Sequence, residues 1–134
     1  MNAPAAAGPA EVLLWLGQNW ARALAEVIEG LSAQKAEAVW MATEPVVDPA
    51  AQQAVLGWRQ PFDLADDGAL AWAAAAEPSW RALGSHVLAA AGVESPGQDE
   101  VRATAVEVLG QAFARLAQSM GERLGHPVVS LAGS

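Results

Sequence analysis

Cysteine and tyrosine are absent from this chain of 134 residues, and basic residues are scarce. Without cysteine there is no disulfide framework and no thiol chemistry. Seven Lys and Arg stand against 15 Asp and Glu, a formal net charge of −8. This balance argues against nucleic acid and anionic membranes as partners, because both select basic patches. No apolar run approaches the roughly 18 residues that span a bilayer, and residues 1–10 lack the pattern of a signal peptide. We therefore expect a cytoplasmic protein without membrane insertion.

Apolar residues make up 53% of the chain and charged residues 16%, which is typical of a globular domain and not of a disordered chain. The length suits one domain with a core of its own. Residues 1–9 are rich in Ala, Pro and Gly, and we expect a disordered lead-in there, with a single domain over residues 10–134. Because the last expected strand stops almost where the sequence does, we expect these residues to be the front part of a longer protein.

One segment of the sequence occurs twice. Residues 16–22 read LGQNWAR, and residues 109–115, 93 positions later, read LGQAFAR. Both copies have apolar residues every three or four positions, as an amphipathic helix does. The separation is too long for a solenoid repeat, whose period is usually about 20–50 residues. We expect one domain built from two related halves, each contributing one long helix.

The apolar patterning and the turn residues predict an α+β fold. Helices are expected at 10–31, 77–91 and 99–124, and strands at 37–43, 55–63, 69–75 and 128–131. The turn Ala65-Asp66-Asp67-Gly68 suits a tight hairpin, Asp99 suits the N-cap of the last helix, and Pro61 should keep its strand at an edge or a bulge. The expected architecture is two long helices packed on a mainly antiparallel sheet, with a shorter third helix.

Two glycines and three tryptophans invite an interpretation beyond packing. Gly17 and Gly110 occupy matching places in the long helices, where glycine costs about 1 kcal/mol relative to alanine. We therefore expect the two helices to approach each other closely there. Trp58, Trp72 and Trp80 surround the expected hairpin and are interpreted as core residues or, alternatively, as an exposed contact patch.

The polar face of the last helix is repeated on the first. Spacings of three or four residues place one ridge of five polar side chains on the last helix: Glu107, Gln111, Arg115, Gln118 and Glu122. Three of them have identical counterparts on the first helix, namely Gln18, Arg22 and Glu29. A solvated face with weak pairs, each worth about 0.2–0.5 kcal/mol, is the plain interpretation. The repetition favours a binding ridge formed by Arg22, Glu29, Arg115 and Glu122. His86 and His126 are isolated, so no metal site is expected.

The segment Thr104-Ala-Val-Glu107-Val-Leu-Gly-Gln111, followed by an Ala-rich helix and Gly125-His-Pro-Val-Val, resembles the CheC-like domains of chemotaxis. These include CheC, CheX and the front domain of the flagellar switch protein FliY, a FliN relative. The family motif is Asp or Ser, three residues, Glu, two residues and Asn, usually once per long helix. The order of elements is also similar from Glu11 to Leu131. The resemblance implies a pseudo-twofold, duplicated CheC-like fold.

The resemblance also implies an activity, the dephosphorylation of the response regulator CheY. In the family the Asn positions the attacking water, the Glu anchors a lysine of the regulator, and the regulator supplies the Mg²⁺. Gln18 and Gln111 fall on the two Asn positions and keep the amide with one extra methylene. Glu11 and Thr104 fall on the Asp or Ser positions.

The glutamate of the motif is missing from both copies. Trp15 and Val108 stand in its place, and Glu107, one residue away, is rotated about 100° around the helix. We therefore expect a protein-interaction or assembly domain with a degenerate phosphatase motif and no cofactor of its own. Its setting would be a flagellar motor switch or chemotaxis component, such as a FliN-type or FliY-type protein at the basal body. The alternatives are an active phosphatase of phosphorylated CheY and an unrelated α+β dimerisation module, and a homodimer is compatible with each.

Overall fold

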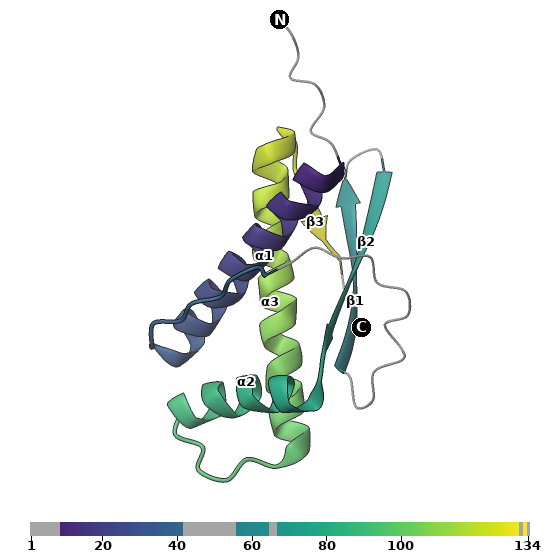
Figure 1. Ribbon diagram of the computed structural model, residues 1–134. Coiled ribbons are helices and arrows are strands. Elements are labelled where there is room, and N and C mark those ends of the chain that lie inside the picture. The colour runs from purple at the N-terminus through teal and green to yellow at the C-terminus, as the bar shows by residue number, and fades with distance from the viewer. Residues whose placement is uncertain (1–8, 42–55, 65–66, 132, 134) are drawn as a thin grey trace, which may run out of the picture.

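The computed structural model describes residues 9–41, 56–64, 67–131 and 133. Along the chain the elements are α1 (Pro9–Ser32), β1 (Leu56–Leu64), β2 (Asp67–Ala75), α2 (Glu77–Ala90), α3 (Gln98–Leu124) and β3 (Val129–Ser130) (Figure 1). The three strands form one antiparallel sheet in the order β2-β1-β3. The α+β class is therefore confirmed. None of the described helices is long and apolar enough to cross a membrane.

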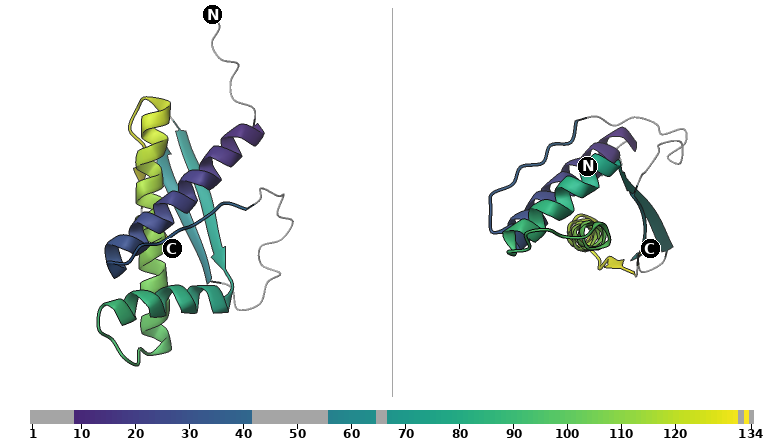
Figure 2. Two further views of the ribbon diagram at one scale, coloured as in Figure 1. Left: turned by 60° about the vertical axis from the view of Figure 1, so that its left-hand side comes forward. Right: turned by 90° about the horizontal axis from the view of Figure 1, so that it is seen from below.

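Helix α3 is the central element. It runs through the middle of the molecule, α1 crosses it, and α2 crosses near its N-terminal end (Figure 1). The β1–β2 hairpin lies alongside α3, and the helices gather on one side of the sheet (Figure 2). Of the expected elements, the two long helices, the shorter third helix α2 and the antiparallel sheet are present. Of the two long helices, it is α3 whose backbone lies against the sheet, and α1 packs mainly on α3.

The core follows one stripe of α3. Eight of its residues are buried: Val101, Ala105, Val108, Leu109, Ala112, Phe113, Leu116 and Ala117. Val108 and Ala112 pack with Val27 of α1, and Leu109 packs with Leu56 of β1 and Trp80 of α2. Burial of one large apolar side chain contributes about 1.5–3 kcal/mol. The helical period of α3 thus aligns these side chains on one stripe, and their contacts join the helices to the sheet.

The ends of the helices agree with the turn residues, with one correction. Gly92 and Gly125, which follow α2 and α3, have φ of 90° and 77°, a region that suits glycine. The N-cap of α3 is Gly97, so the expectation of Asp99 at that position is wrong. Asp99 lies instead in the first turn, where a negative charge is favoured by the exposed N–H groups of the helix.

The expected strand at 37–43 is not formed in the part the structure describes. Residues 35–41 have no regular structure, and Ala42 and Thr43 lie outside the described residues. Contacts with helix α1, and not pairing with a strand, hold the described part of this segment. Glu29 Oε1 accepts a hydrogen bond from Ala36 N at 2.9 Å, and the ring of Trp40 lies against Gly17. The alternating pattern indicated a strand, but one tryptophan and one carboxylate dock the chain on a helix.

The hairpin agrees with the sequence except at its turn. β2 contains the whole expected strand at 69–75, and β3 lies within the expected 128–131. Of the expected strand at 55–63, Val55 lies outside the described residues and the rest lies in β1. Asp67 and Gly68 already belong to β2, where they pair with Leu64 and Asp63. Ala65 and Asp66, the other two residues of the expected turn, lie outside the described residues.

Pro61 lies in the central strand, β1, which corrects the expectation of an edge or a bulge. Its carbonyl accepts a hydrogen bond from Leu131 N at 3.0 Å. The N–H and C=O of a strand residue point to the same neighbour, so the donor that proline lacks would face the β3 side and not β2. Gln60 supplies a substitute, because its Nε2 donates to Leu131 O at 2.7 Å. A side-chain amide thereby takes the place of the missing backbone donor.

The expectation that α1 and α3 approach through Gly17 and Gly110 is wrong. A Cβ on Gly17 would collide with the ring of Trp40, and one on Gly110 would come no nearer than 4.0 Å to the ring of Trp58. Tryptophan rings, not helix backbones, lie over these glycines. The close backbone approach occurs at Gly84 of α2, where a Cβ would collide with the carbonyl oxygen of Val101 in α3.

Candidate functional site

The repeated helices meet at equivalent positions of the repeat. The rings of Trp20 in α1 and Phe113 in α3 lie with their centroids 4.3 Å apart at an angle of 37°. Such aromatic pairs contribute about 0.5–1.5 kcal/mol beyond the area they bury. Phe113 also touches Phe62 of β1 edge-on, with centroids 5.9 Å apart. One aromatic contact thus fixes how the polar faces of the two helices lie relative to each other.

A polar hollow of about 250 Å³ lies between α1 and α3. Except for Ala23, its lining is polar or charged: Asn19, Arg22 and Glu26 come from α1, and Arg115, Gln118, Ser119 and Glu122 come from α3. We call this set of side chains the α1–α3 groove. A larger hollow of about 420 Å³ at the C-terminal turn of α3 is lined mostly by apolar, glycine and proline residues. Charged groups of both helices converge only in the groove, among the hollows described here.

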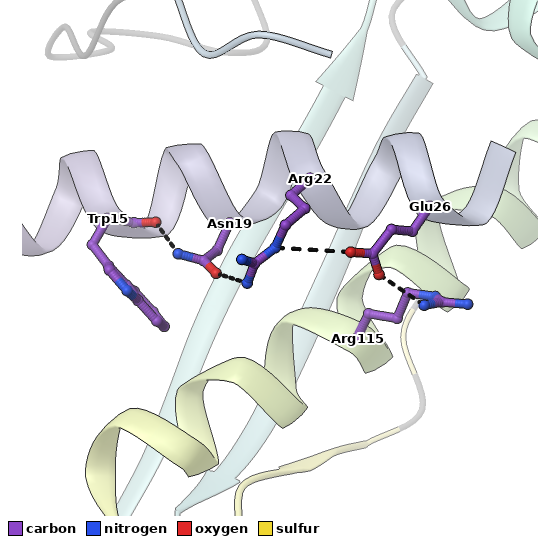
Figure 3. A network of polar contacts seen from close by, with 5 residues as sticks. All are labelled: Trp15, Asn19, Arg22, Glu26 and Arg115. Atoms are coloured by element: carbon purple, nitrogen blue, oxygen red, sulfur yellow. Dashed lines mark hydrogen bonds and ion pairs between the residues drawn. The ribbon is translucent and has the colours of Figure 1, made fainter. Parts of the chain in front are cut away.

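The centre of the groove is a carboxylate shared by two arginines (Figure 3). Arg115 Nη1 lies 2.9 Å from Glu26 Oε2, and Arg22 Nε lies 3.8 Å from Glu26 Oε1. The two arginines occupy the same position in the two copies of the repeat. Glu26 therefore joins the two halves of the sequence by charge, as Trp20 and Phe113 join them by packing.

Arg22 is held from its other side as well. One of its terminal nitrogens donates to Asn19 Oδ1, and Asn19 Nδ2 donates to the carbonyl oxygen of Trp15 at 2.8 Å (Figure 3). The side chains of Arg22, Glu26 and Arg115 remain 63%, 46% and 47% exposed. Exposed ion pairs contribute about 0–1 kcal/mol each. The network therefore orients the charged groups and adds little to stability.

Two groove residues are available for further bonds. The side chains of Glu122 and Gln118 make no hydrogen bond or ion pair with any other residue that the structure describes. The carboxylate of Glu122, the amide of Gln118 and the two partly exposed guanidinium groups together offer hydrogen-bond donors and hydrogen-bond acceptors. Such a surface suits a polar protein partner.

The sequence-predicted ridge is brought together in part. Arg22, Arg115 and Glu122 line the groove. Glu29 does not, because its carboxylate is used to hold the chain that leaves α1. Asn19, Glu26 and Ser119 were not singled out by the repeat. For Glu26 a signal was available, since it follows Arg22 by four residues on the same helix face.

The positions to which the resemblance assigns a phosphatase motif lie outside the groove. Gln18 and Gln111 are exposed on α1 and α3, and Gln111 Nε2 donates to Glu107 Oε1 at 3.2 Å. Thr104 Oγ1 donates to the carbonyl oxygen of Glu100 at 2.9 Å, and Glu11 is exposed in the first turn of α1. No group of three or more His, Asp or Glu side chains that could hold a metal occurs within the described part of the chain.

Comparison with known proteins finds no family model, no curated protein and no solved structure that matches this chain.

Proposed function

We propose that this chain is a protein-interaction and assembly domain that binds a protein partner through the α1–α3 groove. Its setting is a flagellar motor switch or chemotaxis component with a CheC-like fold, and its partner is a CheY-like response regulator or another switch protein. The observation that carries the proposal is the meeting of Arg22 and Arg115, equivalent residues of the repeat, on one carboxylate.

The form of the groove favours a protein partner over a small molecule. Small-molecule sites are usually clefts of about 300–1,000 Å³ that enclose most of the ligand with apolar walls. The groove is smaller, polar and lined by half-exposed charges. Charged and polar groups of this kind give specificity and orientation to a protein–protein contact.

The motif positions favour binding over catalysis. Val108, which stands where the family has its glutamate, is 0% exposed in the core between α1 and α3. A carboxylate there would face apolar side chains and not a partner. Trp15, its counterpart on α1, stacks with Arg123, whose guanidinium carbon lies 4.8 Å from the ring centroid. Neither helix therefore offers an acid at the position where the family motif requires one.

The assay that separates binding from catalysis is the loss of phosphate from a phosphorylated CheY-like regulator, with and without the protein. We expect an unchanged rate, and no effect of Gln111→Ala, because the amide of Gln111 is bonded to Glu107 and has no acidic partner from the motif. An accelerated loss of phosphate that Gln111→Ala abolishes would replace the proposal with the phosphatase alternative.

A further inference from the structure

The face of the sheet that points away from the helices carries large apolar side chains. No described helix covers it (Figure 2). Side chains alternate between the two faces of a strand, and the outward positions include Leu70 and Trp72 of β2 and Val129 of β3, which are 47%, 65% and 52% exposed. Leu131, just after β3, is 47% exposed. Contiguous apolar patches of this kind mark contact sites.

Four rows of residues cross this outer face, and the outermost pairs Gly57 with Ala74. The other three rows carry the large apolar and the charged side chains. The middle row is Leu70, Pro61 and Leu131, joined by the β1–β2 register and by the hydrogen bond from Leu131 N to Pro61 O. One flanking row pairs Trp72 with Arg59, and the other joins Gly68, Asp63 and Val129. The apolar centre thus has a cation on one side and an anion on the other. Arg59 and Asp63 are exposed and make no ion pair with any residue that the structure describes.

This arrangement is complementary to itself. Consider a twofold axis that lies in the plane of contact, perpendicular to β1, and passes over Pro61. It sets Arg59 of each copy opposite Asp63 of the other, and Trp72 opposite Gly68, which has no side chain to obstruct the indole. The centre then consists of Leu70 against Leu70. An axis parallel to the strands would instead oppose Arg59 to Arg59, so the charges select the antiparallel arrangement. A twofold dimer requires a self-complementary surface of this kind.

We propose that the outer face of the sheet binds a second copy of this chain, with the two β1 strands antiparallel and Arg59 paired with Asp63 across the contact. Nine residues at about 3.4 Å and strands about 4.8 Å apart give a face of roughly 300–400 Å² per copy. Stable dimers bury about 800 Å² per partner, so the dimer is weak and depends on concentration. It leaves the α1–α3 groove open, and it does not rest on the proposed function.

Charge reversal tests the arrangement by sedimentation velocity over a range of concentrations. The wild type is expected to dimerise reversibly. Arg59→Asp alone and Asp63→Arg alone each place like charges at both ends of the contact, and each should weaken association about tenfold. An equimolar mixture of these two variants pairs opposite charges again and should associate as the wild type does. The double variant R59D/D63R should also do so.

Thermal unfolding of each variant checks that the domain remains folded, which is expected because both side chains are exposed. Trp72→Ser removes the largest exposed side chain of the face and should weaken the dimer without the charge signature. A chain that stays monomeric at every concentration overturns the proposal, and leaves the face to another protein. The proposal is also overturned if neither charge reversal weakens the association, or if the mixture of the two variants does not associate as the wild type does.

Discussion

At the scale of single residues, Gln60 is a buried amide that joins β1 to the chain after β3. Its side chain is 2% exposed, yet every polar atom of the amide is used. Gln60 Oε1 accepts a hydrogen bond from Trp58 Nε1 at 3.0 Å. Gln60 Nε2 donates to Leu131 O at 2.7 Å and to Pro61 O at 3.0 Å. A buried polar group that is fully bonded specifies one arrangement, and the same group left half-bonded is costly.

Gln60→Leu should therefore lower the free energy of unfolding by about 1–3 kcal/mol, because it leaves Leu131 O and Trp58 Nε1 without these partners. Urea denaturation measures the change. Gln111→Leu, the same substitution on the exposed face of α3, is the control and should stay within about 0.5 kcal/mol of the wild type. Equal effects at the two positions would show that the buried amide has no special role.

The sequence reveals part of this detail. The sequence shows that Pro61 lacks a backbone N–H donor for pairing with a neighbouring strand. Which strand faces that missing donor depends on the strand order. The strand order in turn depends on β3, which lies about 70 residues later in the sequence. The same limit applies to the groove. The repeat identifies Arg22 and Arg115, but Glu26 becomes their common partner only through the way α1 crosses α3. The glycine of closest approach, Gly84, lies outside the repeat.

At the scale of elements, the crossing of α2 over α3 depends on the absence of one Cβ. Gly84 lies against the carbonyl of Val101, so any side chain there forces the helices apart. Gly30, near the end of α1, has nothing within 4 Å of its missing Cβ. Alanine substitutions at Gly84 and Gly30 therefore separate the effect of packing from the intrinsic preference of a helix for alanine.

Gly84→Ala should destabilise the protein by about 1–3 kcal/mol, since overpacking at the crossing outweighs the gain of about 1 kcal/mol in helix propensity. Gly30→Ala should stabilise it by about 0.5–1 kcal/mol. Differential scanning calorimetry of both variants measures the two signs. A stabilising Gly84→Ala would mean that α2 does not pack on α3 as described.

The segment after α1 is held by the Trp40 ring on Gly17 and by the bond from Ala36 N to Glu29. It contains Lys35, the one lysine of the chain, which is exposed. A lysine-specific protease therefore has a single site here. Gly17→Ala should displace the Trp40 ring and speed cleavage after Lys35.

Gly110→Ala is the matched control for this cleavage, because it occupies the equivalent place in the repeat and its Cβ stays 4.0 Å from the Trp58 ring. Its cleavage rate should equal that of the wild type. Rates that rise equally in both variants would indicate general loosening and not release of the Trp40 contact. The alternating pattern around Trp40 predicted a strand because the pattern alone cannot distinguish a strand face from a chain docked on a helix.

At the scale of the whole molecule, four charged side chains, those of Arg22, Glu26, Arg115 and Glu122, lie where the two copies of the repeat meet. The helix lengths, the hairpin and the α+β class followed from periodicity and turn residues, because these signals are local. The crossing angles, the strand order and the shared carboxylate required the folded chain. The folded chain sets the two matched arginines in one groove, beside the side chains of Gln118 and Glu122, which bond to no other residue in the described part of the chain.

The proposal that this groove binds a protein partner is tested most directly by calorimetric titration of two partners into the protein, a phosphorylated CheY-like regulator and a flagellar switch protein. We expect the wild type to bind one of the two, Arg22→Glu with Arg115→Glu to weaken that binding by about tenfold or more, and Arg81→Glu to leave it unchanged. Arg81 pairs with Glu77 on α2 at 2.7 Å, away from the groove, and its side chain is 48% exposed, close to the 47% of Arg115. Binding of neither partner by the wild type, or binding that the groove reversal leaves unchanged, would contradict the proposal.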